Sequence, residues 1–139
     1  MNDPAVIGAH QNMMSINSCV EVDLLGQVCS ESMGSKHYSG TGGQVDFVRG
    51  ANCSSGGRAF IAMHSTAKRG TLSKIKPVLS HGSVVTTSKN DVDTIVTEYG
   101  VARLRGKTAG QRAKALIEIA HPDFRDELRA EAKKMNLMI

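Results

Sequence analysis

The sequence has few of the residues that mark special classes of protein. Among its 139 residues there is no Trp, and aromatic residues make up only 4%, so the core must be built from Val, Ile, Leu, Ala and Met. The three cysteines are odd in number and match no zinc-ligand spacing. No stretch approaches the ~18 consecutive apolar residues of a membrane span, and the first residues lack the layout of an export signal. We therefore expect a cytoplasmic protein with reduced thiols and no membrane partner.

Positively and negatively charged residues are not separated into long runs of one sign. Lys and Arg number 17 against 13 Asp and Glu, giving a formal net charge of +4, and no basic run is longer than a pair. Nucleic-acid binders more often gather basic and aromatic residues in one stretch, so we expect a small polyanionic ligand and no nucleic acid. The five histidines are not spaced as ligands on any predicted element, and we expect no metal site.

The sequence does contain a series of short apolar segments followed by two amphipathic ones. Alternation and β-branched runs predict strands, and capping signals before apolar residues at helical spacing predict helices. The continuously apolar strand at 59–63 is expected to be buried on both faces, and residues 30–41 are expected to form a loop. Predicted strands lie at 13–18, 19–24, 27–29, 59–63, 73–79, 83–87 and 91–99, and predicted helices begin near residues 4, 43, 108 and 122.

The most informative stretch is 39–50, SGTGGQVDFVRG. Gly40, Gly42 and Gly43 do not suit a helix interior, because glycine gives up the most backbone freedom on folding. The apolar residues that follow predict a short helix. Such a junction directs backbone N–H groups and the positive end of the helix dipole toward a phosphate, a carboxylate or an acyl oxyanion. A tight turn that uses its glycines only for steric reasons is the alternative.

Five segments, in order, resemble the C-terminal domain of the acetyl-CoA hydrolase/transferase family, which includes 4-hydroxybutyrate, butyrate and succinate–acetate CoA-transferases. The resemblance extends from Asn2 to about Lys134. It implies an α/β fold of CoA-transferase type, with an open mixed or parallel sheet and flanking helices. It also implies that residues 1–139 are a single domain, the C-terminal half of a larger enzyme with two related domains facing a cleft. The segments are 15–28, 39–47, 96–102, 104–107 and 119–125.

The resemblance also implies a reaction. The family moves CoA between an acyl-CoA thioester and a free acid such as acetate, butyrate or 4-hydroxybutyrate, and a glutamate serves as the covalent nucleophile. The family's glutamate lies in a His-(Ser/Thr)-Glu motif upstream of the segment that begins this chain, and His64-Ser65-Thr66 departs from that motif at its third residue. The chain is therefore expected to lack the nucleophile and to be inactive alone.

The expected partners follow from the same resemblance. Coenzyme A and acyl-CoA are expected as substrates, with no permanently bound cofactor. Small carboxylic acids and the missing N-terminal domain are the other expected partners, and the intact enzyme is expected to form a homo-oligomer. An acetyl-CoA hydrolase, in which water replaces the acceptor acid, and a non-catalytic acyl-CoA-binding module are the alternatives.

Three catalytic positions are implied residue by residue. Asn2 matches an asparagine that donates a hydrogen bond near the thioester, although a helix cap is an equal alternative. Gly43 matches the residue whose backbone N–H holds the thioester oxygen, and together with Gly40 and Gly42 it is expected to bind CoA.

The third position is Glu98, in a Thr-Glu-Tyr-Gly segment. It matches a family glutamate near the active site and is expected to position the substrate, not to act as the nucleophile. A strand-end carboxylate paired with Arg103 or Arg105 is the alternative.

Overall fold

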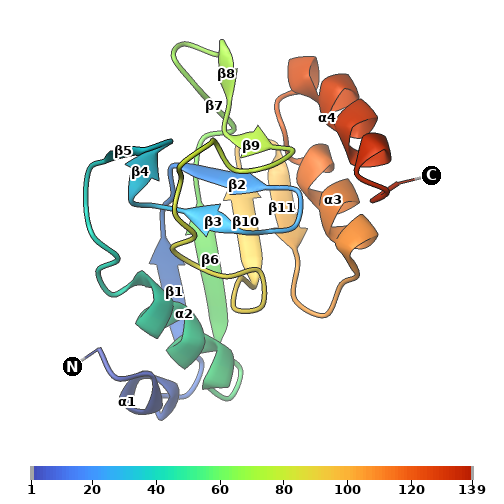
Figure 1. Ribbon diagram of the computed structural model, residues 1–139. Helices are drawn as coiled ribbons and strands as arrows, with labels where there is room; N and C mark the ends of the chain where they lie inside the picture. The colour runs from blue at the N-terminus through green and yellow to red at the C-terminus, as the bar shows by residue number, and fades with distance from the viewer. Residues whose placement is uncertain (1, 139) are drawn as a thin grey trace.

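The main sheet organises the structure, a computed structural model that describes residues 2–138 (Figure 1). Three of its strands are parallel, and the edge strand β11 is antiparallel to β10. The carboxyl ends of β1, β6 and β10 therefore meet at one edge of the sheet, where α/β proteins usually bind their ligands. In spatial order the strands are β1 (Met14–Asn17), β6 (Arg58–Ala62), β10 (Thr94–Thr97) and β11 (Gly100–Arg103).

Smaller β-elements lie over one face of this sheet. A three-stranded sheet has the order β3-β2-β9, and two hairpins extend from it. In Figure 1 the β7–β8 hairpin projects from the top of the molecule, beside the small sheet. The bounds are β2 (Glu21–Asp23), β3 (Val28–Cys29) and β9 (Ile75–Lys76) in the sheet, and β4 (Ser32–Met33), β5 (Lys36–His37), β7 (Thr66–Ala67) and β8 (Leu72–Ser73) in the hairpins.

Local signals fix the helix ends. The Asp3 side chain accepts a hydrogen bond from the first turn of α1, Thr108 and Gln111 form a capping box at α3, and Pro122 opens α4. Helices α1 and α2 lie together at one side of the sheet, and α3 and α4 at the other (Figure 1). No helix within residues 2–138 is long and apolar enough to cross a membrane. The helices are α1 (Pro4–Gly8), α2 (Gln44–Cys53), α3 (Ala109–Glu118) and α4 (Pro122–Lys134).

The main core fills the space between the two sheets and α3. Val22, Ile75, Ile61, Ile95 and Leu116 come from five different elements and have at most 1% of their surface exposed. Burial of such side chains stabilises the fold by about 1.5–3 kcal/mol each.

The structure confirms the α/β class, the mixed sheet and the flanking helices, but corrects four local expectations. Residues 83–87 form no strand, only an isolated bridge from Thr87 to Val28. The strand expected at 73–79 is interrupted and ends before Pro77, which has no N–H for a ladder. The expected loop at 30–41 contains the β4–β5 hairpin. Strand β6 alternates between buried and partly exposed residues, so it is not buried on both faces.

Candidate functional site

The glycine loop leads directly into the N-terminus of α2, as predicted. Gly43 is the N-cap residue, and no side chain among the described residues caps this end of the helix. Gly43 has φ −98°, which any residue adopts, whereas Gly42 has φ +58°, in the left-handed region that favours glycine. The backbone conformation therefore requires glycine at 42 but not at 43. Something other than the backbone conformation must therefore explain why residue 43 is a glycine.

That reason is the close approach of Asn2. A Cβ added to Gly43 would lie 2.5 Å from the Asn2 side-chain nitrogen Nδ2 and 3.4 Å from its Cγ. The approach depends on tight packing of α1 on α2, because a Cβ on Gly50 would collide with Ile7 of α1. Asp3, not Asn2, caps α1 through its bond from Ala5 N (2.8 Å), so the helix-cap interpretation of Asn2 is wrong.

The pair formed by Asn2 and Gly43 presents hydrogen-bond donors. Within residues 2–138, neither the Asn2 amide nor the Gly43 N–H has a hydrogen-bond acceptor. Both lie at the positive end of α2, where the helix dipole favours negative charge. Two donors at a helix N-terminus can bind an oxyanion of the kind that forms when an acyl group is attacked. Ideal Cβ atoms on Gly40 and Gly42 meet no atom within 4 Å, so the loop is open beside the pair.

Glu98 lies just after the carboxyl end of β10. Its two carboxylate oxygens accept from Ser65, which follows β6: Oε2 from Ser65 N (2.8 Å) and Oε1 from Ser65 Oγ (2.7 Å). Burial raises the pKa of Glu98, but the bonds from Ser65, a bond from its own backbone N–H and the nearby His64 together lower it more, so the net pKa is below its ordinary value. In the described part of the chain, no ion pair joins Glu98 to Arg103 or Arg105, so that alternative is wrong. Nor does any hydrogen bond among these described residues join Glu98 to the pair of Asn2 and Gly43.

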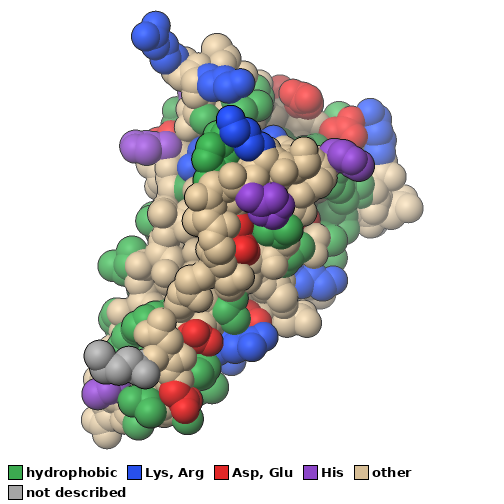
Figure 2. Space-filling view, turned by 60° about the vertical axis from the view of Figure 1, so that its left-hand side comes forward, with side chains coloured by type: hydrophobic (Ala, Val, Ile, Leu, Met, Phe, Trp, Pro, Cys, Tyr) green, Lys and Arg blue, Asp and Glu red, His purple; other side chains and the backbone are tan. Residues whose placement is uncertain are grey.

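A cavity of about 620 Å³ opens under the β7–β8 hairpin, and sequence reasoning did not anticipate it. Its walls combine apolar side chains such as Met33 and Leu72 with the amino groups of Lys74 and Lys76. Figure 2 shows basic side chains at the top of the molecule, over this hairpin, whereas the middle of that face is mostly uncharged. Asn2, Gly43 and Glu98 do not line the cavity.

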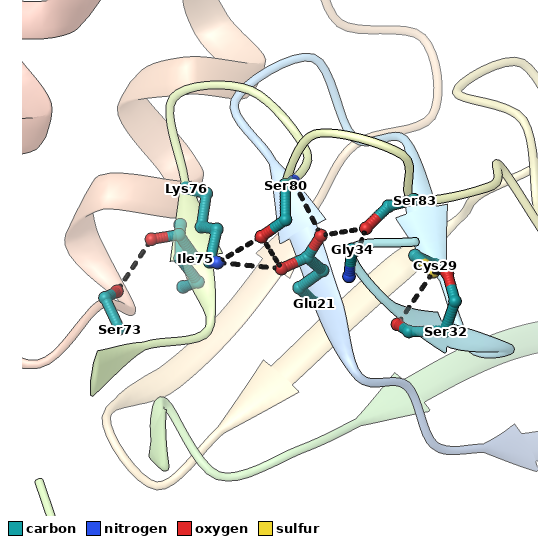
Figure 3. Close-up of polar contacts among 9 residues, drawn as sticks. All are labelled: Glu21, Cys29, Ser32, Gly34, Ser73, Ile75, Lys76, Ser80 and Ser83. Carbon is teal, nitrogen blue, oxygen red and sulfur yellow. Dashed lines mark hydrogen bonds and ion pairs between the residues drawn. The ribbon is translucent and has the colours of Figure 1, made fainter. Parts of the chain in front are cut away.

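One buried carboxylate beside this cavity was also missed. Glu21, in β2, is only 3% exposed and accepts from Ser80 N (2.7 Å), Ser80 Oγ (2.8 Å) and Ser83 Oγ (2.8 Å) (Figure 3). Lys76 Nζ lies 2.9 Å from its Oε2. Both carboxylate oxygens of Glu21 are therefore fully engaged by donors, so Glu21 is a structural anchor and not a free acid or base. In the part of the chain that the structure describes, no three His, Cys, Asp or Glu residues are grouped to hold a metal.

A mixed α/β sheet with a glycine loop at a helix N-terminus defines a domain that can bind the oxygen of an acyl or other anionic group. The model of the acetyl-CoA hydrolase/transferase C-terminal domain family matches residues 1–132. The chain belongs to this family.

Named relatives agree with this assignment. The chain is 63% identical to the 4-hydroxybutyrate coenzyme A transferase of Clostridium kluyveri over 96% of its residues, and 62% identical to the succinyl-CoA:cyclohexane-1-carboxylate CoA transferase of Geobacter metallireducens over 98%. It spans about 31% of the length of each. An acetyl-CoA hydrolase of Candida albicans is 36% identical.

A solved structure has the same fold. The crystal structure of RipA from Yersinia pestis superposes with a TM-score of 0.92 at 50% sequence identity, covering 98% of this chain and 30% of that one.

Proposed function

We propose that this chain is the CoA- and acyl-binding C-terminal domain of an enzyme that moves CoA between an acyl-CoA thioester and a free carboxylic acid, such as acetate, butyrate or 4-hydroxybutyrate. The observation that carries the proposal is the pair of unengaged donors, Asn2 Nδ2 and Gly43 N–H, at the N-terminus of α2. The two CoA-transferases named above are 62–63% identical and the acetyl-CoA hydrolase 36%, which favours transfer to an acid over transfer to water.

The donors act when a carboxylate attacks the thioester. The new C–O bond places a negative charge on the former carbonyl oxygen, which accepts from Gly43 N–H and the Asn2 amide. Collapse of that intermediate re-forms the C=O bond and expels the CoA thiolate, leaving an acyl anhydride on the attacking carboxylate. Preorganised donors stabilise the charged intermediate more than the neutral thioester, so they raise the rate. Glu98, whose two oxygens are fixed by Ser65, positions substrate and is not the nucleophile.

The attacking glutamate belongs to the part of the longer protein that this chain does not contain, consistent with the 31% coverage of its relatives. Small carboxylic acids and acyl-CoA are the proposed partners, and the intact enzyme is proposed to be a homo-oligomer. The free thiols of the described chain support a reducing compartment such as the cytoplasm.

The test is Gly43→Ala in the longer enzyme. A Cβ at 43 would displace the Asn2 amide, which is the far end of an exposed side chain, so the melting temperature should change little. We expect kcat to fall about 100-fold, the scale for a lost oxyanion donor.

Two matched variants complete the experiment. Gly40→Ala adds a Cβ in open space without a positive φ. Because Gly40 is expected to bind CoA and not the acyl oxygen, this variant should change KM more than kcat, and kcat should stay within about twofold of wild type. Gly42→Ala strains the backbone at φ +58° and should lower the melting temperature first. If Gly43→Ala retains near-normal turnover, or if it unfolds as readily as Gly42→Ala, the proposed role of the Asn2 amide beside the Gly43 N–H as a pair of oxyanion donors is refuted.

A further inference from the structure

The glycine loop has almost no packing of its own. Residues 37–42 are exposed, and open space surrounds the ideal Cβ positions of Gly40 and Gly42. Fixing a glycine residue costs more conformational entropy than fixing any other. The loop can hold Gly43 in one place only if its two ends are anchored.

Glu31 anchors the end before the glycines. Its backbone carbonyl accepts from Tyr38 N (2.8 Å) and Ser39 N (3.3 Å). Its side chain connects the loop to a second segment, because Oε1 accepts from Thr41 Oγ1 (3.2 Å) and Oε2 from Thr86 Oγ1 (2.7 Å). A charged acceptor makes each of these bonds stronger than one between neutral groups.

Gln44 anchors the end after the glycines. It is the first residue of α2, and its side-chain Nε2 donates to Thr87 Oγ1 at 3.1 Å. The two ends of the loop therefore converge on two consecutive threonines, Thr86 and Thr87.

These threonines are themselves immobilised. Thr86 is 6% exposed and Thr87 is fully buried. Both of their N–H groups donate to the carbonyl of Val28 (2.8 and 3.1 Å), and Val28 N donates to Thr87 O (3.1 Å). The Thr86 hydroxyl also accepts from Ser30 N (2.9 Å). A buried segment with its polar groups satisfied is a rigid base, because breaking any of these bonds would leave a polar group unpaired.

We propose that Thr86 and Thr87, acting through Glu31 and Gln44, form a clamp that holds the glycine loop in the position from which Gly43 donates to the acyl oxygen. The four residues are positioning residues and do not touch the reacting atoms. The inference rests on the proposed function of Gly43. The clamp supplies the preorganisation that an oxyanion donor needs, and a displacement of about 1 Å can cost up to about 100-fold in rate.

The experiment compares four variants of the longer enzyme. Thr87→Val removes the acceptor for Gln44 without changing side-chain volume, and Glu31→Ala removes the other tether. Glu31→Gln should restore much of the function lost in Glu31→Ala, because an amide still accepts from one of the two threonine hydroxyls. The matched control is Thr94→Val. Thr94 is also fully buried, and its replacement removes one hydrogen bond, from Arg58 Nη2 (3.2 Å), that does not involve the glycine loop.

Two readouts separate the clamp from general stability. Amide hydrogen exchange of 39–46 should accelerate in Thr87→Val and Glu31→Ala but not in Thr94→Val. In the same two variants kcat should fall about 10-fold while KM stays within about twofold, because the loss concerns an interaction made in the transition state.

Each outcome decides the matter. Unchanged exchange of 39–46 in Thr87→Val and Glu31→Ala overturns the clamp, whatever the rates. Faster exchange with unchanged kcat also overturns it as a positioning device. A loss of kcat equal to that of Thr94→Val assigns the effect to stability and overturns the proposal. If the wild-type enzyme itself transfers no CoA, the proposed function has failed. The clamp then has no catalytic role, even if the exchange data show that it tethers the loop.

Discussion

Glu21 gives the sharpest test of what holds the small sheet in place. The Glu21 carboxylate joins β2 to β9 through Lys76 and to the following loop through Ser80 and Ser83 (Figure 3). Ser83 Oγ also accepts from Gly34 N in the β4–β5 hairpin (3.2 Å). One side chain therefore connects three segments, and Glu21→Gln removes its charge while preserving its shape.

The magnitude follows from the environment of the two charges. Breaking a buried ion pair by removing one partner costs about 3–5 kcal/mol. The Lys76 side chain is 22% exposed and can be partly hydrated in the variant, and the glutamine that replaces Glu21 would keep one acceptor oxygen, so we take the lower end, about 3 kcal/mol. For a chain of this size that corresponds to a melting temperature lower by roughly 10 °C.

The pH dependence has a defined sign. Burial raises the pKa of Glu21, but the hydrogen bonds from Lys76, Ser80 and Ser83 lower it more, so its net pKa lies below the ordinary value of 4.5. A carboxyl group with a lower pKa in the folded state stabilises the protein above its unfolded-state pKa, and this contribution disappears as pH falls through the folded-state pKa. The difference between wild type and Glu21→Gln should therefore be complete at neutral pH and shrink progressively below pH 4.5.

The assay is thermal unfolding of both proteins between about pH 7 and about pH 3, the range over which a carboxyl group of this kind titrates, with Asp126→Asn as the control. Asp126 is 97% exposed and paired with Arg129, so its loss should change stability by less than about 1 kcal/mol. A Glu21→Gln melting temperature close to that of Asp126→Asn would refute the argument. A difference from wild type that persists unchanged at the acid end of the range would refute its electrostatic part.

Two further predictions concern packing and thiol reactivity. Leu116 is fully buried on α3, so Leu116→Ala should destabilise the protein by about 2–5 kcal/mol, whereas Val101→Ala, at a position 60% exposed, should cost less than about 1 kcal/mol; equal melting temperatures would show that the α3 face is not core. Burial raises the pKa of Cys19 to about 12, and Cys53 is exposed, so mass spectrometry after iodoacetamide treatment at about pH 8 should find Cys53 alkylated and Cys19 unmodified. Equal alkylation of both would contradict the burial of Cys19.

The sequence predicted those parts of the fold whose cause is local. Thr108, the N-cap of α3, has its capping partner Gln111 three residues away, and Pro122 is the start signal of α4. The glycine loop was predicted for the same reason, since Gly42 and Gly43 lie beside the helix that they precede. The apolar residues that follow the capping signal at Thr108 at helical spacing include Leu116, which is fully buried, as such spacing predicts.

The missed features depend on contacts between distant segments. The resemblance implied that Asn2 and Gly43 both lie near the thioester, but their direct contact depends on the tight packing of α1 on α2 at Gly50, and nothing in the first residues signals that packing. The Ser65 partner of Glu98 follows β6, and the two meet because β6 and β10 are parallel neighbours. Arg103 and Arg105 are much closer to Glu98 along the sequence, which is why an ion pair with one of them was the alternative.

The wrong prediction of a strand at 83–87 bears directly on how the glycine loop is held. In a strand, successive side chains point to opposite faces, so two consecutive threonines could not both bond to the two ends of one loop. The chain instead bends at Thr86 and makes a single bridge at Thr87, and the two hydroxyls bond to Glu31 and Gln44. β-Branched residues favour strands only where neighbouring strands and side-chain packing support them. Here the carbonyl of Val28 accepts both N–H groups, which ends the ladder after one bridge and leaves both side chains available to the loop that carries Gly43.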